Sequence, residues 1–140
     1  AKLIVVGDGP LRTLLTTAAP VWLDYRGACF ADDKVQAFAE ADLVFNPGLV
    51  GLAILDAFAA ALPFVTTDFA GHSPEISYLQ HQVNGLLLPM QPPALLEALR
   101  ALQQDPTRLA ALAHGARQSA ELYSMAAMVA NFSRGVSQCC

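Results

Sequence analysis

An acidic residue and a glycine-containing loop stand close together in NPGLVGLAILDAFAAALP, residues 46–63. The loop, residues 46–51, precedes an apolar, helix-like run in which Asp56 is the only charged residue. The first N–H groups of a helix have no partner within the helix and carry partial positive charge, so a phosphate or diphosphate suits this loop. A carboxylate in the second helical turn leans back toward the loop and can accept hydrogen bonds from ribose hydroxyls. An ordinary strand-to-helix turn and a capped or solvent-facing acid are the alternatives.

Two further loops contain candidate residues. Gly7 opens a Gly-Asp-Gly-Pro turn after an apolar run, but Arg12 stands where a dinucleotide fingerprint has its third glycine. His72 and Glu75 lie in the polar stretch DFAGHSPE, residues 68–75, where they could take part in acid–base chemistry. The same stretch could equally start a short helix with Ser73 as its cap.

The composition argues against several classes of protein. The 140 residues are 54% apolar and 14% charged, with a formal net charge of −4, which argues against disorder and against nucleic acid as a partner. No apolar run reaches the roughly 20 residues that a membrane helix needs. The three cysteines lack the spacing of a disulfide framework or a metal site, so we expect no metal and a reducing compartment, the cytoplasm. The chain begins at Ala1 in a strand-like run, which suggests a piece of a longer protein.

Strand-like and helix-like segments alternate along the chain. The expected strands are Lys2–Val6, Val21–Tyr25, Leu43–Phe45, Pro63–Thr67 and Leu86–Leu88, the last after an Asn84-Gly85 turn. The expected helices are Pro10 to about Ala19, Ala31–Ala39, Gly51–Ala61, Pro74–Leu79, two that start near Pro93 and Pro106, and Met125–Val136. This order predicts an α/β fold, a Rossmann-like doubly wound parallel sheet with C-terminal helices. Because ligands bind beyond the carboxyl ends of such strands, the loops at 7–9, 46–51 and 68–75 are the candidate sites.

Three blocks of the sequence, in order, resemble the C-terminal, nucleotide-binding half of a GT-B glycosyltransferase of the family 4 type. The blocks are LIVVGDGPLR, ADLVFNPGLVGLAILDAFAAALPFVTTD and AGHSPEISYLQHQVNGLLLP, and the resemblance covers about residues 2 to 104. It implies one half of a GT-B fold, with a single donor-nucleotide-binding domain over residues 1–140. The N-terminal acceptor domain and the first βα unit of the family have no counterpart in this sequence, so we expect residues 1–140 alone to be inactive.

The sequence also departs from the family pattern. The family's usual pair of glutamates falls on Gly48 and Asp56, so the ribose-side acid is kept and the sugar-side acid is lost. A subset of relatives carries a P-G-x-V-G-L version of this motif, and residues 47–52 resemble that version. Ala61 stands where glycine is common in the family. The basic pair that neutralises the donor diphosphate precedes the GDGP block in the family and is not in this sequence.

The resemblance implies a retaining transferase that uses a UDP- or GDP-sugar without a metal or other cofactor. Gly51 and Leu52 would offer N–H groups to the diphosphate, and Asp56 would hold the ribose. The segment 26–28 would border the base, and Glu75 would have a structural or donor-loop role. The full set of expected binding residues is Gly7, Arg26, Gly27, Gly48, Leu49, Val50, Gly51, Leu52, Asp56 and Glu75. No catalytic residue is assigned.

The resemblance implies a saccharide, lipid or small-molecule acceptor bound through the missing N-terminal domain, and peripheral membrane association of the full-length enzyme is left open. Two alternatives remain. A GT-B-fold sugar-nucleotide epimerase would need an acid–base pair, for which His72 and Glu75 are the local candidates. A non-catalytic nucleotide-binding module would explain Gly48 in place of an acid.

Overall fold

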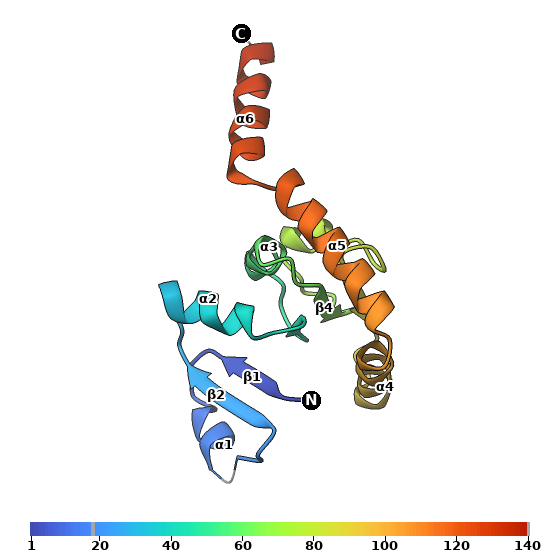
Figure 1. Ribbon diagram of the computed structural model, residues 1–140. Coiled ribbons are helices and arrows are strands. Elements are labelled where there is room, and N and C mark those ends of the chain that lie inside the picture. Colours follow the sequence, from blue (N-terminus) through green and yellow to red (C-terminus); the bar gives the residue numbers. More distant parts are fainter. Residues whose placement is uncertain (18, 140) are drawn as a thin grey trace. The chain divides into compact units, whose positions relative to one another are not determined.

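The computed structural model describes residues 1–17 and 19–139, which form two compact units, Ala1–Ala41 and Asp42–Cys140. Both units are built from parallel strands and helices that alternate along the chain (Figure 1). The α/β class predicted from the sequence is therefore confirmed. The single domain expected over residues 1–140 stays a prediction.

The first unit contains two parallel strands, β1 (Leu3–Val6) and β2 (Leu23–Gly27), and two helices, α1 (Arg12–Thr16) and α2 (Ala31–Ala39). Strand β2 begins two residues later than expected, because Pro20 and Val21 belong to the turn that precedes it and Val21 is fully exposed. Helix α1 is also shorter than expected. Its predicted range, Pro10 to about Ala19, includes Ala18, which lies outside the described residues.

The second unit is built on a three-stranded parallel sheet in the order β3-β4-β5. The strands are β3 (Val44–Asn46), β4 (Phe64–Thr67) and β5 (Gly85–Leu88). Every residue of the central strand β4 is buried, including the polar residues Thr66 and Thr67. The helical segments are α3 (Ala53–Ala59), the 3₁₀ helix η1 (Pro74–Tyr78), α4 (Pro92–Gln103), α5 (Pro106–Leu122) and α6 (Met125–Cys139).

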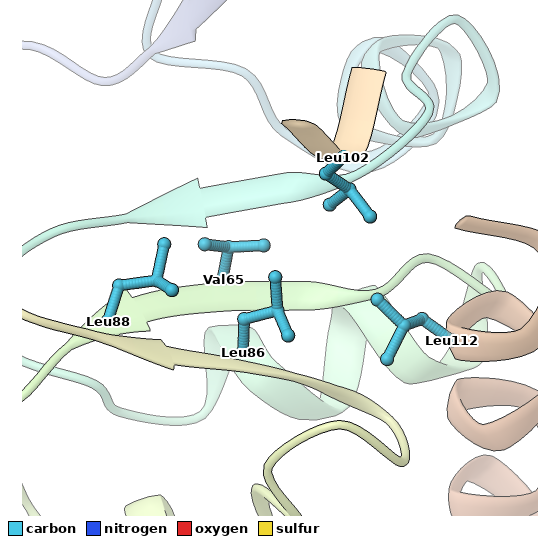
Figure 2. Close-up of a cluster of buried hydrophobic side chains, with 5 residues drawn as sticks. All are labelled: Val65, Leu86, Leu88, Leu102 and Leu112. Atoms are coloured by element: carbon cyan, nitrogen blue, oxygen red, sulfur yellow. The ribbon is translucent and has the colours of Figure 1, made fainter. Parts of the chain in front are cut away.

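The core of the second unit lies between the sheet and helices α4 and α5. Figure 2 shows the side chains of Val65, Leu86, Leu88, Leu102 and Leu112, which are all at most 8% exposed. They come from β4, β5, α4 and α5, so segments far apart in the sequence share one apolar cluster. Burial of an aliphatic side chain contributes about 1.5–3 kcal/mol, so this cluster stabilises the unit.

A buried polar network fixes the turn before β5. The side chain of Asn84 accepts a hydrogen bond from the Gln80 amide (2.7 Å) and donates to the Tyr78 carbonyl and to Ser119 Oγ (both 2.9 Å). Ser119 in turn donates to the Gly115 carbonyl, so this network ties the turn to helix α5. The sequence predicted a turn at Asn84-Gly85 but gave no sign of this connection.

The end of α3 explains why glycine is common at the position of Ala61. Ala61 follows the C-cap residue Ala60 and has a φ of 55°, in the left-handed region that a glycine adopts without strain. Leu62 closes the same helix end by donating to the Ala57 carbonyl at 2.9 Å. Alanine is therefore tolerated at position 61, although the backbone there keeps a geometry that favours glycine.

Helix α6 extends three residues further than expected and has no buried residue. Its apolar side chains include Met125, Met128 and Phe132, all more than half exposed. Within the described ranges, no helix is long and apolar enough to cross a membrane.

Candidate functional site

The loop of residues 46–52 joins the carboxyl end of β3 to helix α3. Asn46 folds its first half, because Asn46 Oδ1 accepts a hydrogen bond from the Gly48 amide (3.1 Å) and Asn46 Nδ2 donates to the Leu49 carbonyl (3.0 Å). This is the Asx-type turn that an asparagine before Pro-Gly favours. One side chain thus holds both an N–H group and a carbonyl group of the loop.

The end of β4 and the segment after it hold the loop from a second direction. Thr67 Oγ1 donates to the Pro47 carbonyl at 2.7 Å. His72 Nδ1 accepts a hydrogen bond from the Val50 amide at 3.1 Å, and His72 Nε2 lies 2.8 Å from the Thr67 carbonyl. An amide N–H must meet an acceptor and a carbonyl must meet a donor, so these partners assign the neutral Nε2–H tautomer to His72.

These contacts determine which loop amides remain available. The Gly48 and Val50 amides are bonded within the loop region, whereas those of Leu49, Gly51 and Leu52 have no acceptor in the described part of the chain. The side chains of Leu49 and Leu52 are exposed and that of Val50 is buried. The two amides expected to face a diphosphate, those of Gly51 and Leu52, are thus among the unbonded ones.

Neither Gly48 nor Gly51 is required by the fold. Neither has a positive φ, so neither position needs the left-handed freedom of glycine. A Cβ at Gly51 would meet nothing within 4 Å, and one at Gly48 would meet only Asn46 Oδ1 at 3.9 Å. With no demand from backbone or packing, the absence of a side chain leaves room in front of the loop, as the phosphate hypothesis requires.

Asp56 lies nearer to the loop than the sequence indicated. Helix α3 begins at Ala53 rather than Gly51, which puts Asp56 in its first turn. Asp56 is half-buried, and its neighbours Ile54 and Ala57 are fully buried. Since side chains of a helix tilt toward its N-terminus, this position suits a carboxylate that serves the loop.

Glu75 and Ser73 differ in part from expectation. The predicted helix is present as the 3₁₀ helix η1, but Ser73 makes no side-chain capping bond. Glu75 lies in its first turn, and Glu75 Oε2 is buried with no partner among residues 1–17 and 19–139. Both ring nitrogens of His72 are occupied by backbone groups, so the geometry gives His72 a structural part rather than that of an acid–base partner to Glu75.

In the first unit, Gly7 and Gly27 meet at the carboxyl ends of β1 and β2. The Gly7 amide donates to the Gly27 carbonyl at 2.7 Å, and the φ angles are 139° and 67°. Glycine is needed at both positions because these φ values are unfavourable for other residues. A glycine turn therefore approaches another backbone closely at this point of the first unit.

A hollow of about 290 Å³ lies beside the end of β2 and is lined by Arg26, Ala28, Cys29, Asp33 and Gln36. Two residues of the segment expected to border a base thus face a cavity. The Arg26 guanidinium itself is engaged, since it donates to Asp24 Oδ2 (2.9 and 3.1 Å) and to both carboxylate oxygens of Glu40. Lys2 Nζ also lies 2.9 Å from Asp24.

These ion pairs shift the acid–base equilibria of the first unit. Hydrogen bonds from Lys2 and Arg26 lower the pKa of Asp24 below its ordinary 3.8, and Arg26 lowers the pKa of Glu40 below 4.5. The same carboxylates raise the pKa of Arg26 above its ordinary value. A carboxyl pKa that is lower in the folded state contributes stability above the unfolded pKa, and this contribution is lost as pH falls through the folded value.

Arg26→Met should therefore make the thermal stability of the first unit less sensitive to acid. We expect wild type to lose more stability than the variant between pH 6 and pH 2.5, because only wild type must protonate paired carboxylates. Calorimetry across this range is the measurement. Arg108→Met is the control, since Arg108 forms no ion pair in the described ranges. Equal acid sensitivity of Arg26→Met and wild type would contradict the assignment.

Several contacts at the loop were not foreseen. The Asx turn of Asn46 could have been found from the sequence Asn-Pro-Gly, but the bonds from Thr67 and His72 join residues 20 and 22 positions apart. No periodicity connects them. Among residues 1–17 and 19–139, no group of His, Cys, Asp and Glu side chains could hold a metal ion.

Comparison with solved structures shows the fold. HepE of Anabaena in complex with UDP matches with a TM-score of 0.76 and 20% identity, over 98% of this chain and 41% of HepE. Sucrose-phosphate synthase of Thermosynechococcus elongatus gives 0.79 and 18%, over 98% and 38%. WaaG, a glycosyltransferase involved in lipopolysaccharide biosynthesis, gives 0.67 and 28%, over 89% and 35%. The chain thus spans less than half the length of these proteins. These matches confirm the Rossmann-like half of a GT-B fold.

No curated protein sequence matches the chain significantly. A protein-family model described as "Glycosyl transferases group 1" matches residues 1–105, which is well over half of the chain. Together with the GT-B fold, this match shows that the chain belongs to the group 1 glycosyl transferases.

Proposed function

We propose that the chain is the donor-binding half of a retaining glycosyltransferase of the family 4 type, in its P-G-x-V-G-L variant. It binds a UDP- or GDP-sugar at the loop of residues 46–52. The observation that carries the proposal is the fixed conformation of this loop, which leaves the Gly51 and Leu52 amides without an acceptor in the described chain and with open space in front of Gly51. HepE, a structural neighbour, has been solved with UDP and with UDP-glucose, which supports a uridine nucleotide donor.

Transfer itself needs residues beyond this chain. We propose that a further domain of the intact enzyme binds a saccharide, lipid or small-molecule acceptor, and that the enzyme acts in the cytoplasm with peripheral association of the full-length protein with a membrane surface. We propose that no metal or cofactor is needed, because the helix amides of this chain and basic side chains from the rest of the intact enzyme neutralise the diphosphate. Measurable sugar transfer by residues 1–140 alone would contradict the proposal that transfer needs a further domain.

A non-catalytic nucleotide-binding module is the second candidate, and Gly48 is the observation that favours it. The family's sugar-side glutamate is replaced by a residue without a side chain, and the Gly48 amide is used within the loop. Screening of nucleotide-sugar donors with the full-length protein separates the two. Sugar transfer supports the enzyme, whereas nucleotide binding without hydrolysis or transfer of any donor supports the module.

Asp56→Ala tests the ribose assignment. We expect UDP affinity to fall by about 1–3 kcal/mol, roughly 5- to 150-fold in Kd, because charge-assisted hydrogen bonds to the ribose are lost. Isothermal titration calorimetry with UDP and GDP is the measurement. Glu97→Ala on the exposed face of α4 is the control, and it should leave the affinity unchanged. An unchanged Kd for Asp56→Ala would remove the ribose assignment.

A further inference from the structure

We propose that His72 is a positioning residue for nucleotide binding, which acts by fixing the orientation of the Val50 amide and hence of the Gly51 and Leu52 amides that follow it. The inference rests on the proposed function, because it assigns a residue that prepares the same loop. The His72 imidazole bonds a backbone amide of the loop and not a reacting atom, so His72 is not a catalytic residue.

The geometry at His72 links the loop to the rigid part of the sheet. The imidazole bonds the Val50 amide on one side (3.1 Å) and the Thr67 carbonyl on the other (2.8 Å). Thr67 is the last residue of the buried central strand β4 and is itself 2% exposed. The imidazole therefore links the end of β4 to the middle of the loop, and the rigid strand restrains the position of the Val50 amide.

Val50 is the point where this restraint has the greatest effect. Its side chain is fully buried, and it lies between the exposed Leu49 and the half-buried Gly51. A buried amide that loses its acceptor destabilises the conformation that holds it, so without His72 the peptide before Val50 would rotate toward another partner. Because backbone peptides are planar and joined by two rotatable bonds, such a rotation would turn the following Gly51 and Leu52 amides away from a common direction.

Neighbouring residues hold the imidazole in place. The Phe69 ring packs against His72 edge to face, with ring centroids 5.6 Å apart and an interplanar angle of 86°. A Cβ on Gly71 would lie 2.6 Å from the Phe69 ring, so glycine at position 71 permits this packing. The segment 69–72 is therefore shaped to support one orientation of the imidazole.

Two variants of His72 test the role. His72→Phe keeps an aromatic ring against Phe69 but removes both bonds, whereas the Oδ1 atom of His72→Asn can still accept from the Val50 amide. We expect UDP affinity, measured by calorimetry, to fall roughly 10-fold or more in His72→Phe and to stay within about 3-fold of wild type in His72→Asn. Amide hydrogen exchange of Val50 in the nucleotide-free protein should accelerate in His72→Phe and stay slow in His72→Asn.

The outcomes separate the inference from the proposed function. If wild type binds UDP or GDP and His72→Phe binds it equally well, His72 has no positioning role and the donor site stands. If wild type binds neither nucleotide, the proposed donor site fails and the role assigned to His72 fails with it. If His72 only stabilised the fold, the melting temperatures of His72→Phe and His72→Asn would fall in proportion to their losses of UDP affinity. That result would also overturn the inference.

Discussion

Gly115→Ala should destabilise the second unit by about 3 kcal/mol, at the upper end of the cost of overpacking a well-packed interior. A Cβ at Gly115 would lie 2.0 Å from the Val83 carbonyl oxygen and 2.7 Å from its carbon. Both atoms belong to the backbone, so no flexible side chain can move aside. Either α5 must shift or the turn at residues 82–84 must move away from it.

Movement of that turn would also break the buried network of Asn84. The Asn84 side chain holds the Tyr78 carbonyl and Ser119 Oγ at 2.9 Å, and Asn84 itself is fully buried. A displaced Asn84 leaves buried polar groups without partners, which adds to the steric cost. The single added methyl group is therefore expected to weaken the docking of α5 on the sheet.

Thermal unfolding followed by circular dichroism measures the effect, and we expect a drop of roughly 10 °C. Gly135→Ala is the matched control, because it is also a helical glycine but a Cβ there meets nothing within 4 Å. Alanine is favoured over glycine within a helix by about 1 kcal/mol, so the control should be unchanged or slightly stabilised. Equal melting temperatures for the two variants would show that the close approach at Gly115 is relaxed in solution.

Local sequence signals were sufficient to predict the elements that build the sheet. The strand expected at residues 63–67 is present as β4, and the alternation of expected strands and helices predicted the α/β class. Asp105-Pro106 correctly marked the start of α5, where Asp105 Oδ1 accepts from the Arg108 amide at 2.9 Å. These features depend on residues close in sequence, where periodicity and capping preferences operate.

The support of the candidate site could not be predicted in the same way. His72 and Val50 lie 22 positions apart, and Asn84 and Ser119 lie 35 apart, so each contact exists only after the chain has folded. The sequence suggested acid–base chemistry for His72 because it stands near Glu75. In the structure, backbone groups occupy both ring nitrogens, so His72 has a structural role in holding the loop. The site residues themselves remain predictions that binding experiments must test.

The role of Arg26 also depends on long-range contacts. The sequence placed Arg26 just after the expected second strand and predicted that it borders a base, whereas in the structure Arg26 lies within β2 and lines the hollow. The guanidinium, however, is held by Asp24 and by Glu40, which lies 14 residues further along the chain. A base bound in the hollow would therefore meet the outer surface of an ion-paired arginine rather than an unpaired one.

Gly51→Asp should abolish most nucleotide binding while leaving the fold intact. At an effective dielectric constant of 20, two unit charges 4 Å apart repel by about 4 kcal/mol, and solvent around an open loop reduces this value. We therefore expect UDP affinity to fall roughly 100-fold. The fold should tolerate the change, because Gly51 has no positive φ and its Cβ position is open.

Gly51→Asn separates charge from size, since asparagine has nearly the same shape as aspartate without its charge. Calorimetric titration with UDP should give an affinity between those of wild type and Gly51→Asp, because asparagine obstructs the approach but does not repel the diphosphate. The Gly51→Asp deficit should also shrink when the salt concentration is raised, as expected for repulsion between partly exposed charges. If both variants bind UDP as tightly as wild type, the diphosphate does not approach the loop at Gly51, and the donor site must lie elsewhere in the molecule. If they bind equally weakly at every salt concentration, Gly51 provides space for the ligand, but the negative charge of the diphosphate does not lie beside it.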